Sequence, residues 1–247
     1  MPLHIFEDTD TLSYAVADWM VDYIASTLEK KGRFTLALSG GSTPRKLHGV
    51  LKDPVYAKKI DWPNVHIFWG DERAVPFGDE RNNAKMAYDT LLNYVPVLSH
   101  HIHIMRTDIP PDSAAMEYDK LLHRYFDLTQ TSFDLVLLGM GEDGHTLSLF
   151  PGSGIIHEKQ DWVKSFFLET QDMYRISLTT PIVNRSAAVA FLVAGQDKAG
   201  TLKQVLEGDF RPENYPSQLI RPENGELHWF ADQAAASELD GAGYRNA

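Results

Sequence analysis

Hydrophobic and polar positions along the chain follow two patterns in turn. Short, mostly apolar runs predict strands buried on both faces, and apolar positions spaced by three and four residues predict helices between them. The predicted strands cover residues 34–38, 65–69, 135–138, 163–168, 175–178, 187–193 and 226–231, and a short strand also fits residues 101–105. The predicted helices cover residues 10–30, 44–51, 83–92, 112–125, 179–184 and 195–206, and a short alanine-rich helix follows the last strand.

The alternation of strands and helices predicts a mainly parallel sheet with helices on both faces, which is a three-layer, Rossmann-like α/β fold. No linker or internal repeat divides the sequence, so we expect a single α/β domain over residues 1–247. Parallel sheets bind ligands beyond the carboxyl ends of their strands. The loops after Leu38, Trp69, Leu138 and Val193 should therefore meet in one cleft.

The first of these loops, Ser39-Gly-Gly-Ser-Thr-Pro44, has the composition of a phosphate-binding turn. Its glycines expose backbone N–H groups, and a helix with Ser42 or Thr43 as N-cap and Pro44 as first residue would add its positive dipole end. The loop lacks the Gly-Lys-Ser/Thr ending of a P-loop, so we do not infer nucleotide hydrolysis. The alternative is an ordinary strand–helix turn with a good cap.

Cations follow other strands of the predicted sheet. Arg73 comes just after a strand, beside Asp71 and Glu72, and could offer a fork of donors to a phosphate. Asp71 could orient a substrate hydroxyl or hold Arg73, and the alternative for the whole segment is a surface ion pair. Arg175 and Lys198 stand at element boundaries near the same edge, so the sequence favours a pocket for an anion.

His145 lies in a segment that begins as a buried strand and breaks into glycines at 139, 141 and 144. We expect a helix to begin at His145, whose N-terminal end would keep the imidazole neutral and able to accept a proton. Asp143 could bind the other ring nitrogen and fix the tautomer. A neutral histidine in this place favours a general base that activates water. The alternative is a histidine hydrogen-bonded to a loop carbonyl.

Two other ligand classes are disfavoured. The three glycines fit the dinucleotide fingerprint, and Glu169 could serve as its acid, but the sequence Pro151-Gly-Ser-Gly154 ends the following helix too early for NAD binding. His100, His101 and His103 resemble a metal cluster, but no acid or cysteine is spaced to complete it, and a solvated strand end is favoured.

Composition narrows the function further. The chain carries 23 Lys and Arg against 34 Asp and Glu, a net charge of −11, and no basic stripe, which argues against a nucleic-acid partner. It has no cysteine, no apolar run of membrane-spanning length and no signal peptide, so we expect a cytoplasmic protein without a membrane partner. A small anionic substrate remains compatible with this charge.

The motifs together resemble those of the 6-phosphogluconolactonases, within the glucosamine/galactosamine-6-phosphate isomerase superfamily. The resemblance rests on residues 38–44, 70–73, 139–151, 175–179 and 195–199, which occur in order and span most of the chain. It implies the superfamily's fold and hydrolysis of 6-phospho-D-glucono-1,5-lactone in the oxidative pentose phosphate pathway, without a metal or organic cofactor. It also implies that His145 is the base and that the substrate phosphate is held by Gly40, Gly41, Ser42 and Arg73, assisted by Arg175 and Lys198. We expect a monomer or weak homodimer.

The sequence departs from the family at Leu147, where a small alanine is usual, which could narrow the pocket. The rival within the superfamily is an aminosugar-6-phosphate deaminase or isomerase. Those enzymes carry a glutamate after the central histidine, whereas residues 147–151 here contain no acid, and they favour a tyrosine where this chain has Arg73. A non-catalytic sugar-phosphate sensor is a further alternative, and an NAD oxidoreductase ranks below it.

Overall fold

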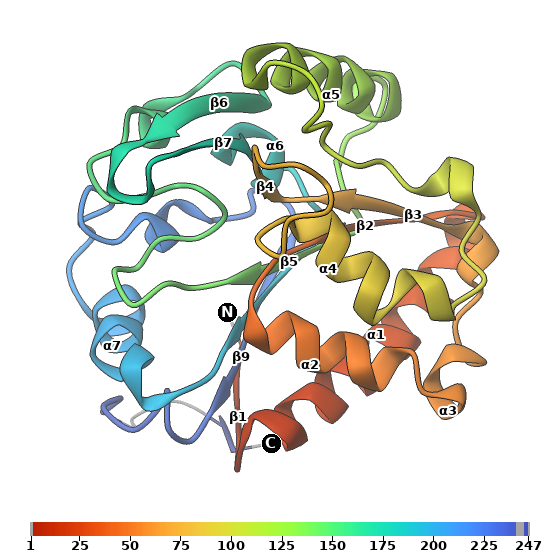
Figure 1. The fold of residues 1–247 in the computed structure, drawn as a ribbon. Helices are drawn as coiled ribbons and strands as arrows, with labels where there is room; N and C mark the ends of the chain where they lie inside the picture. Colours follow the sequence, from red (N-terminus) through yellow and green to blue (C-terminus); the bar gives the residue numbers. More distant parts are fainter. Residues whose placement is uncertain (1, 241–244, 247) are drawn as a thin grey trace.

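The computed structural model describes residues 2–240 and 245–246. At its centre is a seven-stranded sheet with the order β10-β1-β9-β8-β5-β2-β3, in which every neighbouring pair is parallel (Figure 1). Its strands are β1 (Leu3–Phe6), β2 (Phe34–Leu38), β3 (Val65–Trp69), β5 (Leu135–Gly139), β8 (Ala188–Val193), β9 (Glu226–Asp232) and β10 (Arg245–Asn246). The mainly parallel α/β architecture expected from the sequence is confirmed.

A second, antiparallel sheet packs beside the first and contains three short strands in the order β4-β7-β6. These are β4 (Asp71–Arg73), β6 (Val163–Leu168) and β7 (Met173–Leu178). Because β4 follows β3 after a single residue, Gly70, the chain passes directly from the central sheet into the second sheet. This passage brings the cationic side chains of β4 and β7 next to the end of β3.

Seven α-helices connect the strands in the described residues: α1 (Thr9–Lys31), α2 (Ser42–Leu51), α3 (Pro54–Ala57), α4 (Asn83–Thr90), α5 (Pro111–Phe126), α6 (Thr180–Val183) and α7 (Ala199–Glu207). The 3-10 turns are η1 (Trp62–Asn64), η2 (Leu92–Tyr94), η3 (Ser99–His101), η4 (Gly154–His157), η5 (Glu169–Gln171), η6 (Gln196–Lys198) and η7 (Pro216–Leu219). No described helix is both long and apolar enough to cross a membrane.

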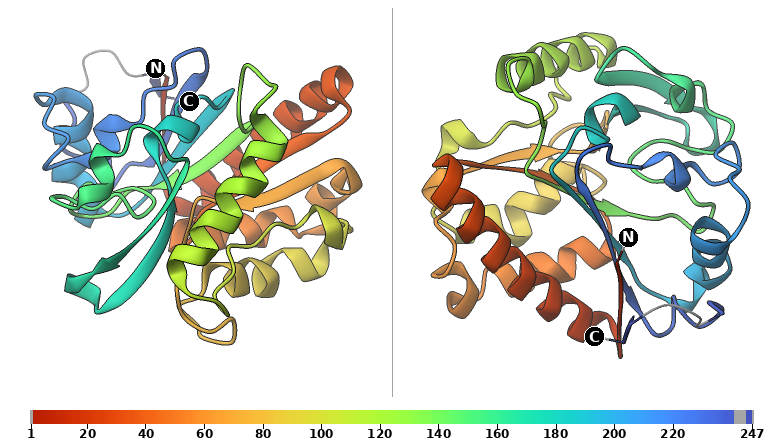
Figure 2. Two further views of the ribbon diagram at one scale, coloured as in Figure 1. Left: turned by 90° about the horizontal axis from the view of Figure 1, so that it is seen from above. Right: turned by 180° about the vertical axis from the view of Figure 1, so that it is seen from behind.

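The central sheet has a hydrophobic core on each face, because successive side chains of a strand point to opposite sides. In β5, Leu135 and Leu137 belong to the core beneath α1, α2 and α4, whereas Val136 and Leu138 belong to the core beneath α5, α6 and α7. Figure 2 shows α1 and α7 on opposite sides of the sheet. The near-continuous apolar runs in the sequence therefore reflect burial on both faces, as predicted.

Several local predictions were wrong. The strand β1 was not predicted, and residues 101–105 form the end of η3 and a single bridge at Ile102 instead of a strand. The alanine-rich tail forms turns over residues 233–239, because Asp232 caps them through its carboxylate, which accepts from the Ala235 amide at 2.8 Å. That residues 1–247 make a single domain stays a prediction.

Candidate active site

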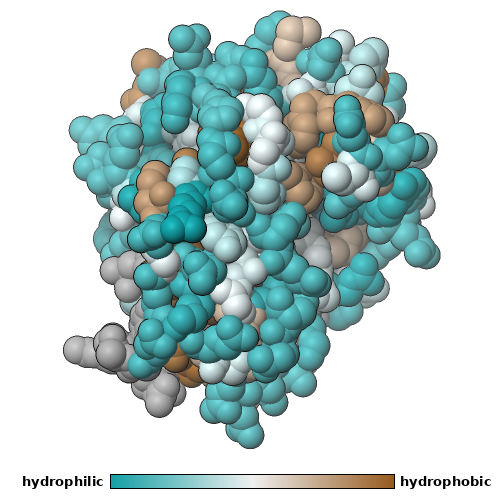
Figure 3. Space-filling view, turned by 90° about the vertical axis from the view of Figure 1, so that its left-hand side faces the viewer, coloured by the Kyte–Doolittle hydropathy of each residue, from teal (hydrophilic) through white to brown (hydrophobic). Residues whose placement is uncertain are grey.

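A cleft of about 400 Å³ lies at the carboxyl ends of the central strands. The loops after β2, β3, β5 and β8 all contribute to its lining, as the prediction of parallel strands implied. Figure 3 looks onto the side of the molecule that carries the loop after β5 and helix α7, where hydrophilic side chains dominate the surface. The cleft is lined by polar and charged groups from segments far apart in the sequence, including His145, Arg73, Arg175 and Lys198.

His145 and Asp143 form a closely coupled pair beside this cleft. The Asp143 carboxylate Oδ1 lies 2.5 Å from Nδ1 of the His145 ring and also accepts from the His145 amide at 3.1 Å. Partial burial raises the pKa of Asp143, but the hydrogen bonds and charge of His145 outweigh it, and the net pKa lies below the usual value. Asp143 does reach His145, and the ring's Nε2 has no hydrogen-bond partner among the described residues.

Phe150 and Gly141 also restrict the orientation of the His145 ring, in addition to the contact of Asp143 with Nδ1. The Phe150 ring stacks against it, with centroids 4.1 Å apart and planes 25° apart. A β-carbon added to Gly141 would lie 2.1 Å from Nδ1 of His145 and 2.5 Å from Oδ1 of Asp143, so only glycine allows this approach. The orientation of the ring is therefore set by three neighbours rather than by one.

The helix that we expected to begin at His145 is absent. Residues 140–153, all of which the structure describes, form turns and one short bridge between Thr146 and Leu149. Three residues take left-handed backbone conformations there: Gly144 with φ 79°, Leu147 with φ 54° and Gly152 with φ 68°. The helix-dipole argument for His145 therefore fails. The same absence argues against a dinucleotide-binding site, because such a site needs a helix directly after the glycines to bind the pyrophosphate.

Leu147 occupies space that a glycine provides. Its side chain is only 6% exposed and lines the cleft. A β-carbon added to Gly70, the residue between β3 and β4, would lie 2.5 Å from Cδ2 of Leu147. The absence of a side chain at Gly70 therefore makes room for the leucine at this position. Burial of the apolar Leu147 side chain offsets the cost of its left-handed backbone conformation.

The glycine-rich turn after β2 forms one wall of the cleft through Gly40, Gly41 and Ser42. The N-cap of α2 is Gly41, with φ 109°, and not Ser42 or Thr43 as predicted. A backbone with φ of this sign at the cap favours glycine, and the helix begins at Ser42, two residues before the predicted Pro44. No side chain caps this helix end, and its first-turn N–H groups are left for an anion.

Gly40 is required by the neighbouring helix. A β-carbon at Gly40 would lie 2.0 Å from Oδ1 of Asn83, the first residue of α4, and the Asn83 amide donates to the Asp71 carbonyl at 2.9 Å. The sequence alone does not mark Asn83 as a site residue. Its only signal was the predicted start of a helix at residue 83.

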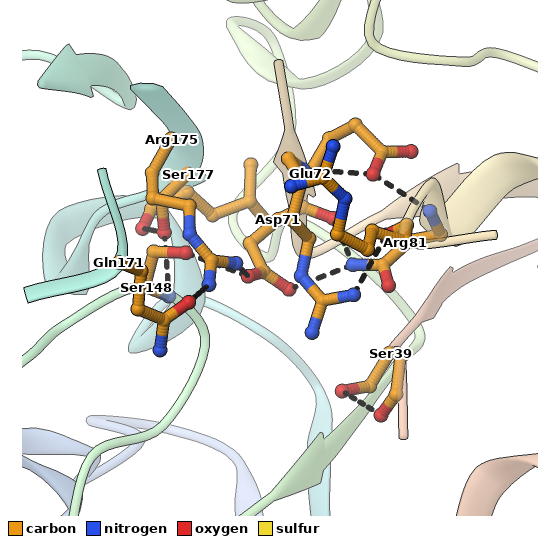
Figure 4. Close-up of polar contacts among 12 residues, drawn as sticks. Ser39, Asp71, Glu72, Arg81, Ser148, Gln171, Arg175 and Ser177 are labelled. Atoms are coloured by element: carbon orange, nitrogen blue, oxygen red, sulfur yellow. Dashed lines mark hydrogen bonds and ion pairs between the residues drawn. The ribbon is translucent and has the colours of Figure 1, made fainter. Parts of the chain in front are cut away.

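Glu72 ties this helix to β4 (Figure 4). Its fully buried carboxylate accepts from the amides of Arg73, Asn83 and Ala84 at 2.7–2.8 Å. Burial raises the pKa of Glu72 to about 7, and the three amide hydrogen bonds oppose this rise. Because Glu72 is buried, it does not form the surface ion pair that was the alternative interpretation of residues 71–73.

Arg73 lines the cleft with one donor already used. Its guanidinium donates to the Arg81 carbonyl at 2.7 Å, and its buried Nε has no partner among the described residues. Asp71 does not hold Arg73. Instead, its carboxylate accepts from the Ser148 hydroxyl at 2.7 Å and lies 3.9 Å from the Arg175 guanidinium (Figure 4). Asp71 thus positions Ser148 and Arg175, and a role in orienting a substrate hydroxyl stays a prediction, since Asp71 also lines the cleft.

Arg175 is almost completely buried at the back of the cleft. Its guanidinium donates to the Gln171 side chain and lies 5.7 Å from the centre of the Phe150 ring, and its Nε has no partner among the described residues. Burial lowers the pKa of Arg175, with Asp71 opposing and Arg73 adding to the effect. The sequence did not indicate roles for Gln171, Ser148 and Phe150, because the second sheet places Gln171 here and the turns after β5 place Ser148 and Phe150.

Lys198 completes the group of cations from the opposite side of the cleft. Its ammonium lies 3.2 Å from the Asp197 carboxylate and 3.7 Å from that of Glu142, and its side chain is 19% exposed. The cleft thus joins a neutral turn with free N–H groups, three cations and a histidine–aspartate pair. This arrangement can bind a small anion and transfer a proton to His145.

Metal binding has no support in the described residues, where no three His, Asp or Glu side chains are placed to hold an ion. His101 and His103, two of the three histidines weighed as ligands, stack on a third ring. The His66 ring lies 3.6 Å from that of His101 and 6.0 Å from that of His103. None of these rings lines the cleft.

Comparison with known proteins adds independent information. The family model described as "Glucosamine-6-phosphate isomerases/6-phosphogluconolactonase" matches residues 7–229. The 6-phosphogluconolactonase of Nostoc sp. is 35% identical over 241 residues, which cover 96% of this chain and 98% of that protein. The structure of 6-phosphogluconolactonase from Trypanosoma brucei aligns with a TM-score of 0.82 and 25% identity, covering 96% of this chain and 98% of that one.

A structure of a monomeric glucosamine-6-phosphate deaminase also aligns with a TM-score of 0.82, at 19% identity, and covers 96% of this chain and all of that one. The same fold therefore carries both activities. The choice between them rests on the cleft.

Proposed function

Because the chain belongs to the family of glucosamine-6-phosphate isomerases and 6-phosphogluconolactonases, we propose that it hydrolyses 6-phospho-D-glucono-1,5-lactone to 6-phospho-D-gluconate in the oxidative pentose phosphate pathway. The proposal rests mainly on the Asp143–His145 pair, in which Oδ1 of the aspartate lies 2.5 Å from Nδ1 of the histidine. The cleft beside this pair is also lined by Arg73, Arg175 and Lys198. A base and an anion site in one cleft are what hydrolysis of a phosphorylated lactone requires.

Substrate binding is assigned to the phosphate end of the cleft. The free N–H groups at the start of α2, from Gly40 to Ser42, cradle the phosphate, and Arg73, which lines the cleft, adds its guanidinium charge. Arg175 and Lys198 assist with their charge. Holding the phosphate fixes the lactone carbonyl near His145, and such positioning supplies much of the rate enhancement of enzymes.

His145 acts as general base through Nε2, because Nδ1 is engaged by Asp143. As water attacks the lactone carbonyl, its proton passes to Nε2, and the carbonyl becomes a tetrahedral oxyanion. The oxyanion then collapses, the ring C–O bond breaks, and the imidazolium returns the proton to the leaving hydroxyl oxygen. Asp143 holds the required tautomer and stabilises the imidazolium that forms.

The amides of Gly141 and Gly144 do not serve the oxyanion. The Gly141 amide donates to the His145 carbonyl at 2.8 Å, and the Gly144 amide donates to the Gly141 carbonyl at 3.0 Å. Both amides are thus already used. The positive field of Arg73, Arg175 and Lys198 favours the developing negative charge instead.

The cleft favours the lactonase over the deaminase. Residues 147–151 contain no acid, and the hydroxyl of Ser148 in that stretch is bound to Asp71 at 2.7 Å. The intact pair of Asp143 and His145 likewise favours an enzyme over a sugar-phosphate sensor. Location in the cytoplasm, activity without a metal or organic cofactor, and a monomer or weak homodimer are parts of the same proposal.

The test offers the purified protein freshly prepared phosphogluconolactone and, separately, glucosamine 6-phosphate. We expect acid release from the lactone well above the spontaneous rate and no ammonia from the amino sugar. Ammonia release without faster lactone hydrolysis would replace the proposal with the deaminase. A protein that binds both compounds and converts neither would support the sensor.

A further inference from the structure

A second cavity lies at the other end of the central sheet. Its volume is about 340 Å³, and its lining comprises Arg33, His103, Leu121, Arg124 and Tyr125. Arg33 immediately precedes β2, whereas the active-site cleft begins after the last residue of β2. Because β2 has five residues at about 3.3 Å each, the two sites are separated by roughly 16 Å along the sheet.

The two arginines of this cavity are exposed and converge on one side chain. The Arg33 guanidinium lies 5.4 Å from the centre of the Tyr125 ring. Arg33 and Arg124 both act on Tyr125 electrostatically and oppose the effect of burial, which raises the pKa of that phenol. Neither arginine forms an ion pair with a carboxylate among the described residues. Apart from a hydrogen bond from Nη2 of Arg33 to the Tyr125 carbonyl at 3.5 Å, neither guanidinium has a hydrogen-bond partner among the described residues, so the other donors are available on the cavity side.

Two histidine rings lie behind Tyr125. The Tyr125 hydroxyl lies 2.8 Å from Nε2 of His103 and 3.0 Å from Nδ1 of His66. Burial lowers the pKa of both His66 and His103 to about 4, and neighbouring positive groups add to the effect. For His66 these include His101 and Arg33.

No acid opposes this positive potential. The cavity lining contains no carboxylate, and none contributes to the pKa of His66, His103 or Tyr125. In a chain with a net charge of −11, a cavity whose lining carries two arginines and no carboxylate is an unbalanced local field. Such a field attracts a small anion, and an arginine fork matches the oxygens of a phosphate group.

We propose that the cavity between Arg33 and Arg124 binds a phosphate group, either as inorganic phosphate or as part of a small phosphate ester, at a site separate from the active-site cleft. The two guanidinium groups contact the phosphate oxygens, and His103 and the Tyr125 hydroxyl form the floor. The proposal does not depend on the lactonase assignment, because the two sites share no lining residue.

The test follows the histidine ring signals of isotope-labelled full-length protein by NMR while inorganic phosphate is added. In a second arm, phenyl phosphate is added instead, and the tighter ligand identifies free phosphate or an ester as the source. We expect the ring signals of His66 and His103 to shift in a saturable way. The same titration of the Arg73→Gln variant, in which binding in the cleft is weakened, should leave these shifts unchanged.

The decisive variant is Arg33→Gln/Arg124→Gln. Because charge-assisted hydrogen bonds are lost, it should bind phosphate about tenfold or more weakly at this site. The matched control, Lys58→Gln/Lys59→Gln, removes the same charge from two exposed lysines that line neither cavity and should bind as the wild type does. If the double arginine variant does not fold, Arg124→Gln alone replaces it. Unmoved His66 and His103 signals, or equal shifts in arginine and lysine variants, would overturn the proposal.

Discussion

Gly141 and His145 approach each other so closely that no side chain fits between them. A β-carbon on Gly141 would lie 2.1 Å from Nδ1 of the His145 ring, the atom that Asp143 binds at 2.5 Å. The glycine therefore decides whether the histidine–aspartate pair can form. By contrast, a β-carbon on Gly139, in the same segment, meets nothing within 4 Å.

Gly141→Ala should abolish most of the lactonase activity, because the methyl group displaces the His145 ring from Asp143. We expect kcat to fall by about 10²-fold or more, in line with the usual contribution of a positioned base. Gly139→Ala is the matched control and should retain activity. Steady-state kinetics on both variants, with circular dichroism to check folding, make the comparison; equal activity of the two would contradict the account.

Arg73→Ala should weaken substrate binding more than it slows turnover, because the guanidinium is assigned to the phosphate rather than to the reacting carbonyl. The expected result is a KM raised about tenfold, the value of one charge-assisted hydrogen bond. Arg45→Ala removes an equal charge from an exposed position on α2 that does not line the cleft. A KM that changes alike in both variants would mean that net charge, not contact, is responsible.

The contact between Gly70 and Leu147 predicts a non-additive pair of mutations. Gly70→Ala should destabilise the protein by about 1–3 kcal/mol, because the new β-carbon would meet Leu147 Cδ2 at 2.5 Å. Leu147→Ala should be destabilising by itself but should remove this clash, so the double variant should be more stable than the sum of the single changes predicts. Urea unfolding of the four proteins measures the coupling, and simple additivity would refute the contact.

Glu72 should make stability depend on pH near neutrality. Its carboxyl titrates at about 7 in the folded protein against 4.5 in the unfolded chain, so folding favours the protonated form. This contribution is fully present below 4.5 and is lost as the pH rises through 7. Relative to the non-titrating variant Glu72→Gln, the wild type should lose up to roughly 3 kcal/mol of unfolding free energy over this range. A pH-independent difference between the two proteins would contradict the assignment.

The fold was largely predictable because the strands of the central sheet are buried on both faces. Continuous apolar runs such as Leu135–Leu138 indicate this burial directly. Because parallel strands bind ligands beyond their carboxyl ends, the sequence also predicted that Ser42, Arg73, His145 and Lys198 lie in one cleft. These are properties of local pattern and topology. They need no knowledge of side-chain packing.

The surroundings of His145 were not predictable in the same way. The expected helix after Gly144 is replaced by turns, because Leu147 adopts a left-handed backbone and buries its side chain against Gly70, a contact between residues far apart in sequence. Phe150 and Gln171 reach the site for a similar reason, through the turn and the second sheet. Tertiary packing overrode the local pattern at the place where the chemistry is proposed.

The most direct test of the central claim is the rate of phosphogluconolactone hydrolysis by His145→Ala, corrected for spontaneous hydrolysis. If His145 removes the proton from the attacking water, kcat should fall by about 10²–10⁴-fold. KM should change little, because the phosphate site is intact. Turnover by His145→Ala at the wild-type rate would contradict the account.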